Sequence, residues 1–315
     1  MRALAWLLDS PNLLDAAAPY WTGRIASLGP VGAATASWLA ALDADPAPLD
    51  AALGGKVYSR LGLYAEKLMA FYFAQHGQLV EHGLQVRVAH KGGKDTVGEF
   101  DFLLQAPAGL RHIEFATKFY LIDSAVDTTD FDLLVGPNLG DTLGRKMRKI
   151  FDQQLALAQH PAAQAVLPQP VTSAQALVKG WLYYPPGRDP VVPGLTPDHC
   201  RGRWYTLGDM AGQASAPDQP DERFVVMPRL QWLAPLKVPA ARGPDDALPP
   251  TPPALSRAEL AALLAQKFAA DQSPVMVAAV REEGGWLLEE ARAFIVPDDW
   301  PVRAALRRGL GEPRA

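Results

Sequence analysis

The sequence predicts a mixed α/β (α+β) fold, and this prediction rests mainly on three stretches of the chain. Residues 98–104 and 111–121 are apolar, strand-like runs separated by a short turn, and they contain Asp101 and Glu114 respectively. Residues 59–76 instead repeat apolar side chains every three or four positions, which is typical of a helix. Helix-like and strand-like periods in neighbouring stretches favour a fold that contains both element types.

The elements that follow from these patterns form a simple order of helix, three strands, helix, strand. Five prolines break residues 1–56 into short helices, because proline disfavours continuation of a helix. The predicted core elements are a helix at 59–76, strands at 84–90, 98–104 and 111–121, a helix from about 142 to 160 and a strand at 176–184.

The last third of the chain has a different texture. Short strands are predicted at 204–207 and 224–232, and the proline-rich residues 235–253 read as a linker. Ser256 and Glu259 form a capping box that begins a helix, which ends near residue 270. A hairpin of strands 275–281 and 286–294 follows. We therefore predict three parts: an N-terminal helical segment at 1–56, a core at 57–190 and a smaller C-terminal α+β unit at 191–315.

Bulk properties limit the classes of protein to which the chain can belong. The 315 residues are 49% hydrophobic and 20% charged, as in ordinary globular proteins. The net charge of −4 argues against a surface built for non-specific DNA binding, although it allows a local basic groove. Cys200 is the single cysteine, which excludes an intrachain disulfide and a multi-cysteine zinc site. With no secretory signal and no membrane span apparent, we expect a cytoplasmic location.

Asp101 and Glu114 are the candidate metal ligands. An ionised carboxylate inside an apolar strand is costly unless it is paired or binds a cation. If residues 105–110 form a hairpin turn, the two acids come close together, and Glu66 on the preceding helix could add a third carboxylate. Mg²⁺ takes oxygen ligands from one or two carboxylates together with water and phosphate, so the pattern favours phosphodiester chemistry. Lys118 shares a face with Glu114, because side chains alternate along a strand.

The order of these elements, with Glu on the helix, Asp on the second strand and Glu and Lys on the third, resembles the core of the PD-(D/E)XK nuclease superfamily. The chain more closely resembles an uncharacterised bacterial family that is known only as a domain of unknown function and is thought to belong to this superfamily. That likeness runs from about Arg60 to the segment 294–301. It rests on GEFD at 98–101, EFATKFYL at 114–121, GPNLGD at 136–141 and KGWLYYP at 179–185.

The resemblance implies a restriction-endonuclease-like core and a role for each acidic residue. Glu66 is then the helical acid, Asp101 and Glu114 are the ligands of Mg²⁺ or Mn²⁺, and Lys118 is the catalytic lysine. Glu99 is expected to support the ligands from the same strand. The chain departs from the superfamily pattern at Ala116, where the lysine usually stands, and Lys118 lies about 6.6 Å farther along an extended strand.

The helix predicted at 142–160 is the candidate nucleic-acid contact. Lys146, Lys149 and Gln153 recur at helical spacing and can share a face, with Arg145 nearby. Basic side chains on one helix face are suited to phosphate contacts.

These observations predict a Mg²⁺-dependent nuclease that hydrolyses DNA, with RNA left open as the substrate. The alternative is a nuclease-like scaffold without activity that binds nucleic acid or a protein partner, and the displaced lysine favours it. The sequence leaves the mode of cleavage, the sequence preference and the oligomeric state open.

Overall fold

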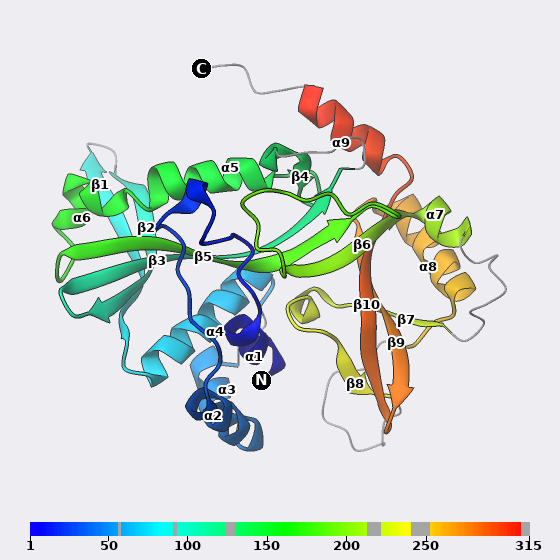
Figure 1. Cartoon of the computed structure of the whole chain (residues 1–315), viewed down its shortest axis with the longest axis horizontal. Helices are drawn as coiled ribbons and strands as arrows, with labels where there is room; N and C mark the ends of the chain where they lie inside the picture. The colour runs from blue at the N-terminus through cyan, green and yellow to red at the C-terminus, as the bar shows by residue number, and fades with distance from the viewer. Residues whose placement is uncertain (56–57, 91–92, 124–129, 213–221, 241–252, 310–315) are drawn as a thin grey trace. The chain divides into compact units, whose positions relative to one another are not determined.

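The computed structural model describes residues 1–55, 58–90, 93–123, 130–212, 222–240 and 253–309 (Figure 1). Helices and strands are interspersed along the chain, which confirms the predicted α+β class. The chain forms two compact units, and each collects separated stretches: 1–118, 144–180 and 192–200 in the first, and 119–143, 181–191 and 201–315 in the second. The division into 1–56, 57–190 and 191–315 stays a prediction.

The first unit contains the predicted core elements in the predicted order. The helix α4 (Leu61–Gln75) is followed by the strands β1 (Leu79–His90), β2 (Gly93–Ala106) and β3 (Gly109–Ile122), and later by β5 (Val171–Tyr184). In the sheet these strands stand in the order β1-β2-β3-β5. β1 and β2 pair antiparallel, as do β2 and β3. The strands are longer than predicted, and residues 91–92 of the turn between β1 and β2 lie outside the described residues.

The N-terminal residues contain the predicted short helices α1 (Arg2–Asp9), α2 (Ala33–Ala44) and α3 (Ala47–Leu53), with a 3₁₀ turn at Pro19–Trp21. Part of this stretch hydrogen-bonds along β5. The N–H of Leu13 donates to the carbonyl of Val178, and the N–H of Ala26 donates to that of Ala176. These bonds satisfy polar backbone groups on β5 that would otherwise need another partner.

The helix predicted at 142–160 is broken in the structure, so that prediction is wrong in its detail. α5 (Leu143–Arg148) continues into a π-helical turn at Lys149–Gln154, and a 3₁₀ turn at Leu157–Gln159 and α6 (Pro161–Gln164) follow. The N–H of Leu155 bonds to the carbonyl of Ile150, five residues earlier, at 2.9 Å. A π-helical turn inserts one residue into the helix, which rotates every later side chain relative to α-helical spacing.

One core of the first unit lies between β1, β2 and the segment after α5. Its apolar side chains come from both strands and from the turns at 157–163, so they hold this segment against the sheet. The buried members are Val86, Phe100, Leu103, Leu110, Leu157 and Ala163.

The second unit contains β6 (Cys200–Thr206), β7 (Arg223–Val226), β8 (Lys237–Pro239), β9 (Val275–Glu283) and β10 (Trp286–Val296). β9 and β10 form the predicted antiparallel hairpin, and β10 also pairs parallel with β6. The strand predicted at 224–232 is too long, because β7 ends at Val226 and a 3₁₀ turn follows at Arg229–Gln231. β8 lies inside the predicted linker, and residues 241–252 of that linker lie outside the described residues.

Four helical pieces and one short strand complete the described part of this unit. β4 (Leu134–Val135) pairs with the end of β3 and follows a 3₁₀ turn at Phe131–Leu133. The helices are α7 (Leu207–Gly212), α8 (Arg257–Ala270) and α9 (Trp300–Gly309). Among the described residues of both units, no helix is long and apolar enough to span a membrane.

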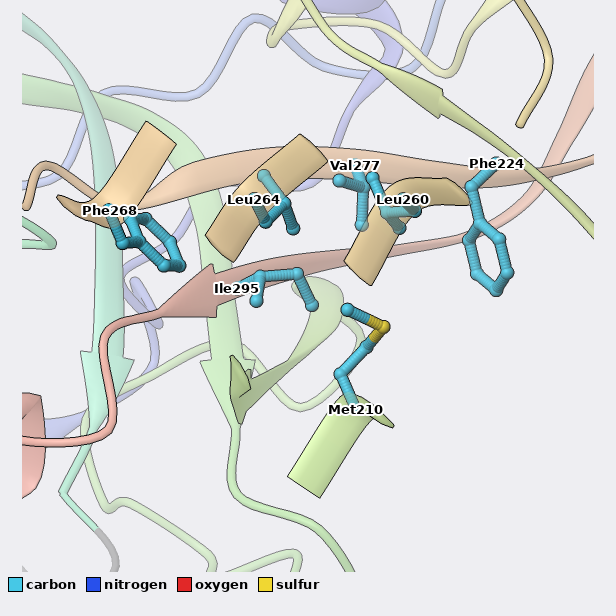
Figure 2. Packing of buried hydrophobic residues seen from close by; sticks show 7 residues of the cluster. All are labelled: Met210, Phe224, Leu260, Leu264, Phe268, Val277 and Ile295. Carbon is cyan, nitrogen blue, oxygen red and sulfur yellow. The ribbon is translucent and has the colours of Figure 1, made fainter. Parts of the chain in front are cut away.

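α8 is the main helix of the second unit's core. Its capping box is present as predicted: the Ser256 hydroxyl accepts from the N–H of Glu259, and the Glu259 carboxylate accepts from the N–H of Ser256 at 2.8 Å. Figure 2 shows the α8 side chains directed toward strand residues Val277 and Ile295. The cluster consists of Met210, Phe224, Leu260, Leu264, Phe268, Val277 and Ile295.

Gly180 is expected to be essential for the approach of β5 to β3. A methyl group at Gly180 would lie 2.0 Å from the main-chain oxygen of Lys118. Gly180→Ala should therefore force the two strands apart and lower the free energy of unfolding by about 3 kcal/mol, measured by urea denaturation. Gly62→Ala, in α4 with no atom within 4 Å of the new methyl group, is the control and should be neutral or stabilising. Equal effects of both substitutions would contradict the close approach.

Candidate metal and phosphate site

The two predicted ligands lie beside each other where β2 and β3 meet. The antiparallel pairing of β2 with β3 runs from Ala106 opposite Gly109 to Phe102 opposite Ile113, and Asp101 and Glu114 are the next residues on each strand. There Oδ2 of Asp101 accepts a hydrogen bond from the main-chain N–H of Phe115 on β3 at 2.8 Å. The hairpin geometry that the sequence predicted is thus confirmed.

Glu114 is a buried acid with only 2% of its surface exposed. The Gln154 side-chain amide donates a hydrogen bond to its Oε1. Among the described residues, Oε2 of Glu114 and Oε1 of Gln154 have no hydrogen-bond partner. Two buried acceptors without donors are costly, so the site as it stands favours a proton or a cation beside them.

His112 lies next to Glu114 on the same face of β3, two residues earlier. Its ring is fully buried against Phe100, and burial lowers its pKa to about 4, so the ring is neutral near pH 7. Its Nε2 stands 3.9 Å from Oε2 of Glu114, beyond hydrogen-bond distance. Because a neutral ring cannot form an ion pair, His112 gives Glu114 no compensating charge.

The electrostatics of the two acids follow from this burial. Burial raises the pKa of Glu114, and the neighbouring Asp101 raises it further. Burial also raises the pKa of Asp101, although the bond from Phe115 N–H acts in the opposite direction. Lys146 lowers the pKa of both groups. The result is a pair that holds protons more tightly than ordinary carboxyl groups, and a divalent cation would displace those protons.

Glu66 belongs to α4, which lies on the other side of the strands from α5 (Figure 1). Its charge raises the pKa of both Asp101 and Glu114. His82 on β1 holds it, with Nε2 at 2.7 Å from Oε1 of Glu66. The charge of Glu66 therefore acts on both other predicted acids, and the structure adds a histidine that the sequence analysis did not select.

The cations that act on the acids come from α5 and the turn after it. Lys146 is half-buried, and Lys149 is exposed but still lowers the pKa of Glu114. Lys118, the predicted catalytic lysine, is half-buried on β3, four residues after Glu114, and its main chain packs against Gly180. Arg145 is exposed. Glu99 is half-buried and accepts from the Gln85 amide at 3.0 Å.

The π-helical turn decides which glutamine contacts the site. With α-helical spacing, Gln153 would follow Lys146 and Lys149 on one face, as predicted from the sequence. The extra residue of the turn brings Gln154 to Glu114, and Gln153 is exposed. No propensity in the sequence marks a π turn, so Gln154 could not be chosen over its neighbour. His112 could have been found, because it shares a strand face with Glu114.

The donor set fits a cation bound by few protein ligands. Among the described residues, no group of three or more His, Cys, Asp or Glu side chains is arranged to hold a metal ion. Two carboxyl groups remain, and Mg²⁺ is commonly held by one or two carboxylates, with water and substrate phosphate completing its shell. The acceptor oxygen of Glu114 that lacks a donor is consistent with such a ligand. The arrangement suits a metal that binds together with a phosphate.

Comparison with known proteins identifies one family. A family model described as "Domain of unknown function (DUF1853)" matches residues 2–296. No curated protein and no solved structure matches the chain.

The burial of Glu114 should make stability depend on pH. Its pKa is raised from 4.5 to about 9, so the unfolded chain releases this proton at lower pH than the folded chain. The stabilising effect of protonation is complete below pH 4.5 and is lost as pH rises toward 9. Relative to the natural protein, Glu114→Gln should therefore gain stability across this window, by at most about 1.4 kcal/mol per pH unit for one proton.

Urea denaturation at a series of pH values measures this effect. Glu81→Gln, which removes an exposed carboxyl group from strand β1 of the same sheet, is the matched control. If the stability difference for Glu114→Gln followed the same pH profile as that for Glu81→Gln, the assignment of a buried, protonated Glu114 would be wrong.

The π-helical turn makes a second prediction about neighbouring glutamines. Gln154→Ala should lower the free energy of unfolding by about 1–3 kcal/mol, because it removes the donor to a buried carboxyl group. Gln153→Ala should change it by less than about 0.5 kcal/mol, since that side chain is exposed. Denaturant titration of both variants measures the two effects. A larger effect at Gln153 would contradict the π-helical turn and favour regular α-helical spacing.

Proposed function

This chain belongs to the DUF1853 family, whose function is unknown, and we propose that it is a Mg²⁺-dependent nuclease that hydrolyses phosphodiester bonds in DNA. The observation that supports the proposal is the convergence of Asp101 and Glu114 beside Lys146, with Glu66 acting on both acids. A buried and a half-buried carboxyl group with raised pKa values are costly for the fold, and such cost is typical of functional sites. RNA is the other nucleic acid that the site could accept.

Asp101 and Glu114 would hold the cation, which can be Mg²⁺ or Mn²⁺. The bound ion would polarise the scissile phosphate and lower the pKa of the attacking water. The contribution of the chain is to orient the two carboxyl groups. The Phe115 N–H fixes the orientation of the Asp101 carboxylate, and Gln154 fixes that of Glu114. Two carboxyl groups with fixed orientations would fix the position of the reacting phosphate. Such positioning supplies most of the rate enhancement in phosphoryl transfer.

Lys146 is the cation best supported for contact with a substrate phosphate at this site. It acts on both acids, and an ammonium group there would stabilise negative charge that develops on the phosphate. Lys118 remains the candidate for positioning the attacking water, as its place on the strand of Glu114 implies. Arg145, Lys149 and Gln153, which are exposed along the same segment, would contact the nucleic-acid backbone.

The likeness to PD-(D/E)XK nucleases enters here as part of the proposal. In support, the order of α4, three strands, a broken helix and β5 follows the superfamily core, and the charge of Glu66 acts on both Asp101 and Glu114. Cleavage of nucleic acid would follow from that likeness, and a cytoplasmic location remains part of the proposal.

A second candidate is a nuclease-like scaffold that binds nucleic acid or a protein partner without cleavage. Two observations favour it. Ala116 occupies the place where the superfamily carries its lysine, and a protonated Glu114 is already bonded to Gln154. The two candidates differ in one measurable property, namely uptake of a divalent cation that depends on Asp101.

Calorimetric titration with Mg²⁺ and Mn²⁺, followed by cleavage assays on DNA and RNA, tests the proposal. Asp101→Asn should abolish cation uptake and reduce cleavage by about 100-fold or more. Asp152→Asn, which removes an exposed acid from the turn after α5, is the matched control and should retain both. Cation uptake that is unchanged by Asp101→Asn would refute the metal site, and the absence of both Asp101-dependent uptake and cleavage would favour the scaffold.

A further inference from the structure

A cavity of about 270 Å³ lies in the first unit, between the N-terminal residues, α4 and the strands β2, β3 and β5. Phe73, Leu104 and Ile113 give it a buried apolar floor, whereas polar groups form the larger share of its accessible lining. Its rim contains the exposed Gln78 and Gln105, so the cavity opens to solvent. A small apolar floor surrounded by polar groups is suited to a small polar ligand.

Arg111 provides the charge of this cavity. It is half-buried, and no carboxylate stands among the described residues that line the space. Its Nε donates to Oε1 of Gln175 at 2.8 Å, and the Gln175 amide donates to the carbonyl of Gly23 at 2.9 Å. The guanidinium group is thus fixed in orientation by a neutral partner that leaves its charge uncompensated.

Among the described residues, none accepts a hydrogen bond from the remaining donors of Arg111. Within the described part of the chain, the bond from Nε is the single hydrogen bond or ion pair of this side chain. Burial lowers its pKa, although an arginine keeps its proton in proteins. A partly desolvated cation with two open amino groups presents a fork that matches the oxygens of a carboxylate or phosphate.

We propose that this cavity binds a small organic anion, whose carboxylate or phosphate pairs with Arg111. The volume exceeds that of a bare phosphate ion and suits a ligand with several further atoms, which would rest on the apolar floor. The side-chain amide of Gln78 has no hydrogen bond to another described residue, so it can bind a polar group of the ligand at the rim.

This site is independent of the proposed nuclease chemistry. Arg111 and Ile113 alternate with His112 and Glu114 along β3, so they face the opposite side of the sheet. The anion would therefore bind without a metal ion and without Asp101 or Glu114. Failure of either proposal leaves the other standing.

Isothermal titration of the full chain in EDTA-containing buffer tests the inference. The probes are inorganic phosphate, glycerol 3-phosphate and citrate, with glycerol as the neutral control. EDTA removes divalent cations, so the acid pair cannot recruit a phosphate through a metal. We expect saturable binding of glycerol 3-phosphate or citrate that is tighter than that of inorganic phosphate, and no binding of glycerol. The stronger of the two identifies the anion as a phosphate or a carboxylate.

Substitutions assign the binding to the cavity. Arg111→Gln should weaken it by about tenfold or more, and Arg111→Lys should weaken it less. Arg87→Gln, which removes an exposed arginine from β1, is the matched control and should leave affinity unchanged. Gln78→Glu places a negative charge at the exposed rim, where folding is not at risk, and should also reduce affinity.

Two outcomes would overturn the proposal. One is the absence of saturable binding for all three anions. The other is affinity that is the same in the natural protein and in a folded Arg111 variant, or, if those variants do not fold, in Gln78→Glu.

Discussion

The desolvation of two carboxyl groups, one buried and one half-buried, where β2 and β3 meet is the constraint on which the rest of the first unit depends. Asp101 and Glu114 come from apolar strands, and each is desolvated by the packing that forms those strands. The fold compensates only partly. The Phe115 N–H and the Gln154 amide supply one hydrogen bond to each acid, and Lys146 supplies charge. A desolvated carboxyl group is stable when it is protonated or bound to a metal ion. The site is therefore suited to exchange its protons for a bound cation.

Two departures from regular structure make that partial compensation possible. Asp101 accepts the main-chain N–H of Phe115, just beyond the paired part of β2 and β3, and this bond ties the acid to the neighbouring strand. The π-helical turn at Lys149–Gln154 carries one residue more than α-helical geometry, and this residue brings Gln154 to Glu114. Each departure gives up regular backbone pairing for a bond to a carboxyl group. Such irregularities are frequent at functional sites, where a side chain must be aimed rather than packed.

The sequence predicted well whatever depends on local period. Three such features were predicted: the helix at 59–76, the hairpin that brings Asp101 to Glu114 and the capping box at Ser256. Each depends on residues that are close together in the sequence. It predicted poorly what depends on tertiary packing. The helix at 142–160 is broken, and hydrogen bonds tie the N-terminal residues to β5. Neither feature has a local pattern, since distant partners decide both.

Strand β3 shows why the acid pair could be read from the sequence when the cavity at Arg111 could not. Both sets of residues alternate along the same strand, one on each face. Glu114 is conspicuous in the sequence because an ionised acid among apolar residues is costly unless it is paired or binds a cation. Arg111 lies near the start of β3, just after a turn, where a basic residue is common. Its importance arises from Gln175, which lies 64 residues farther along the chain and fixes the guanidinium group without neutralising it. A neutral anchor on a partly buried cation is visible only in three dimensions, and it is this uncompensated charge that would select an anion.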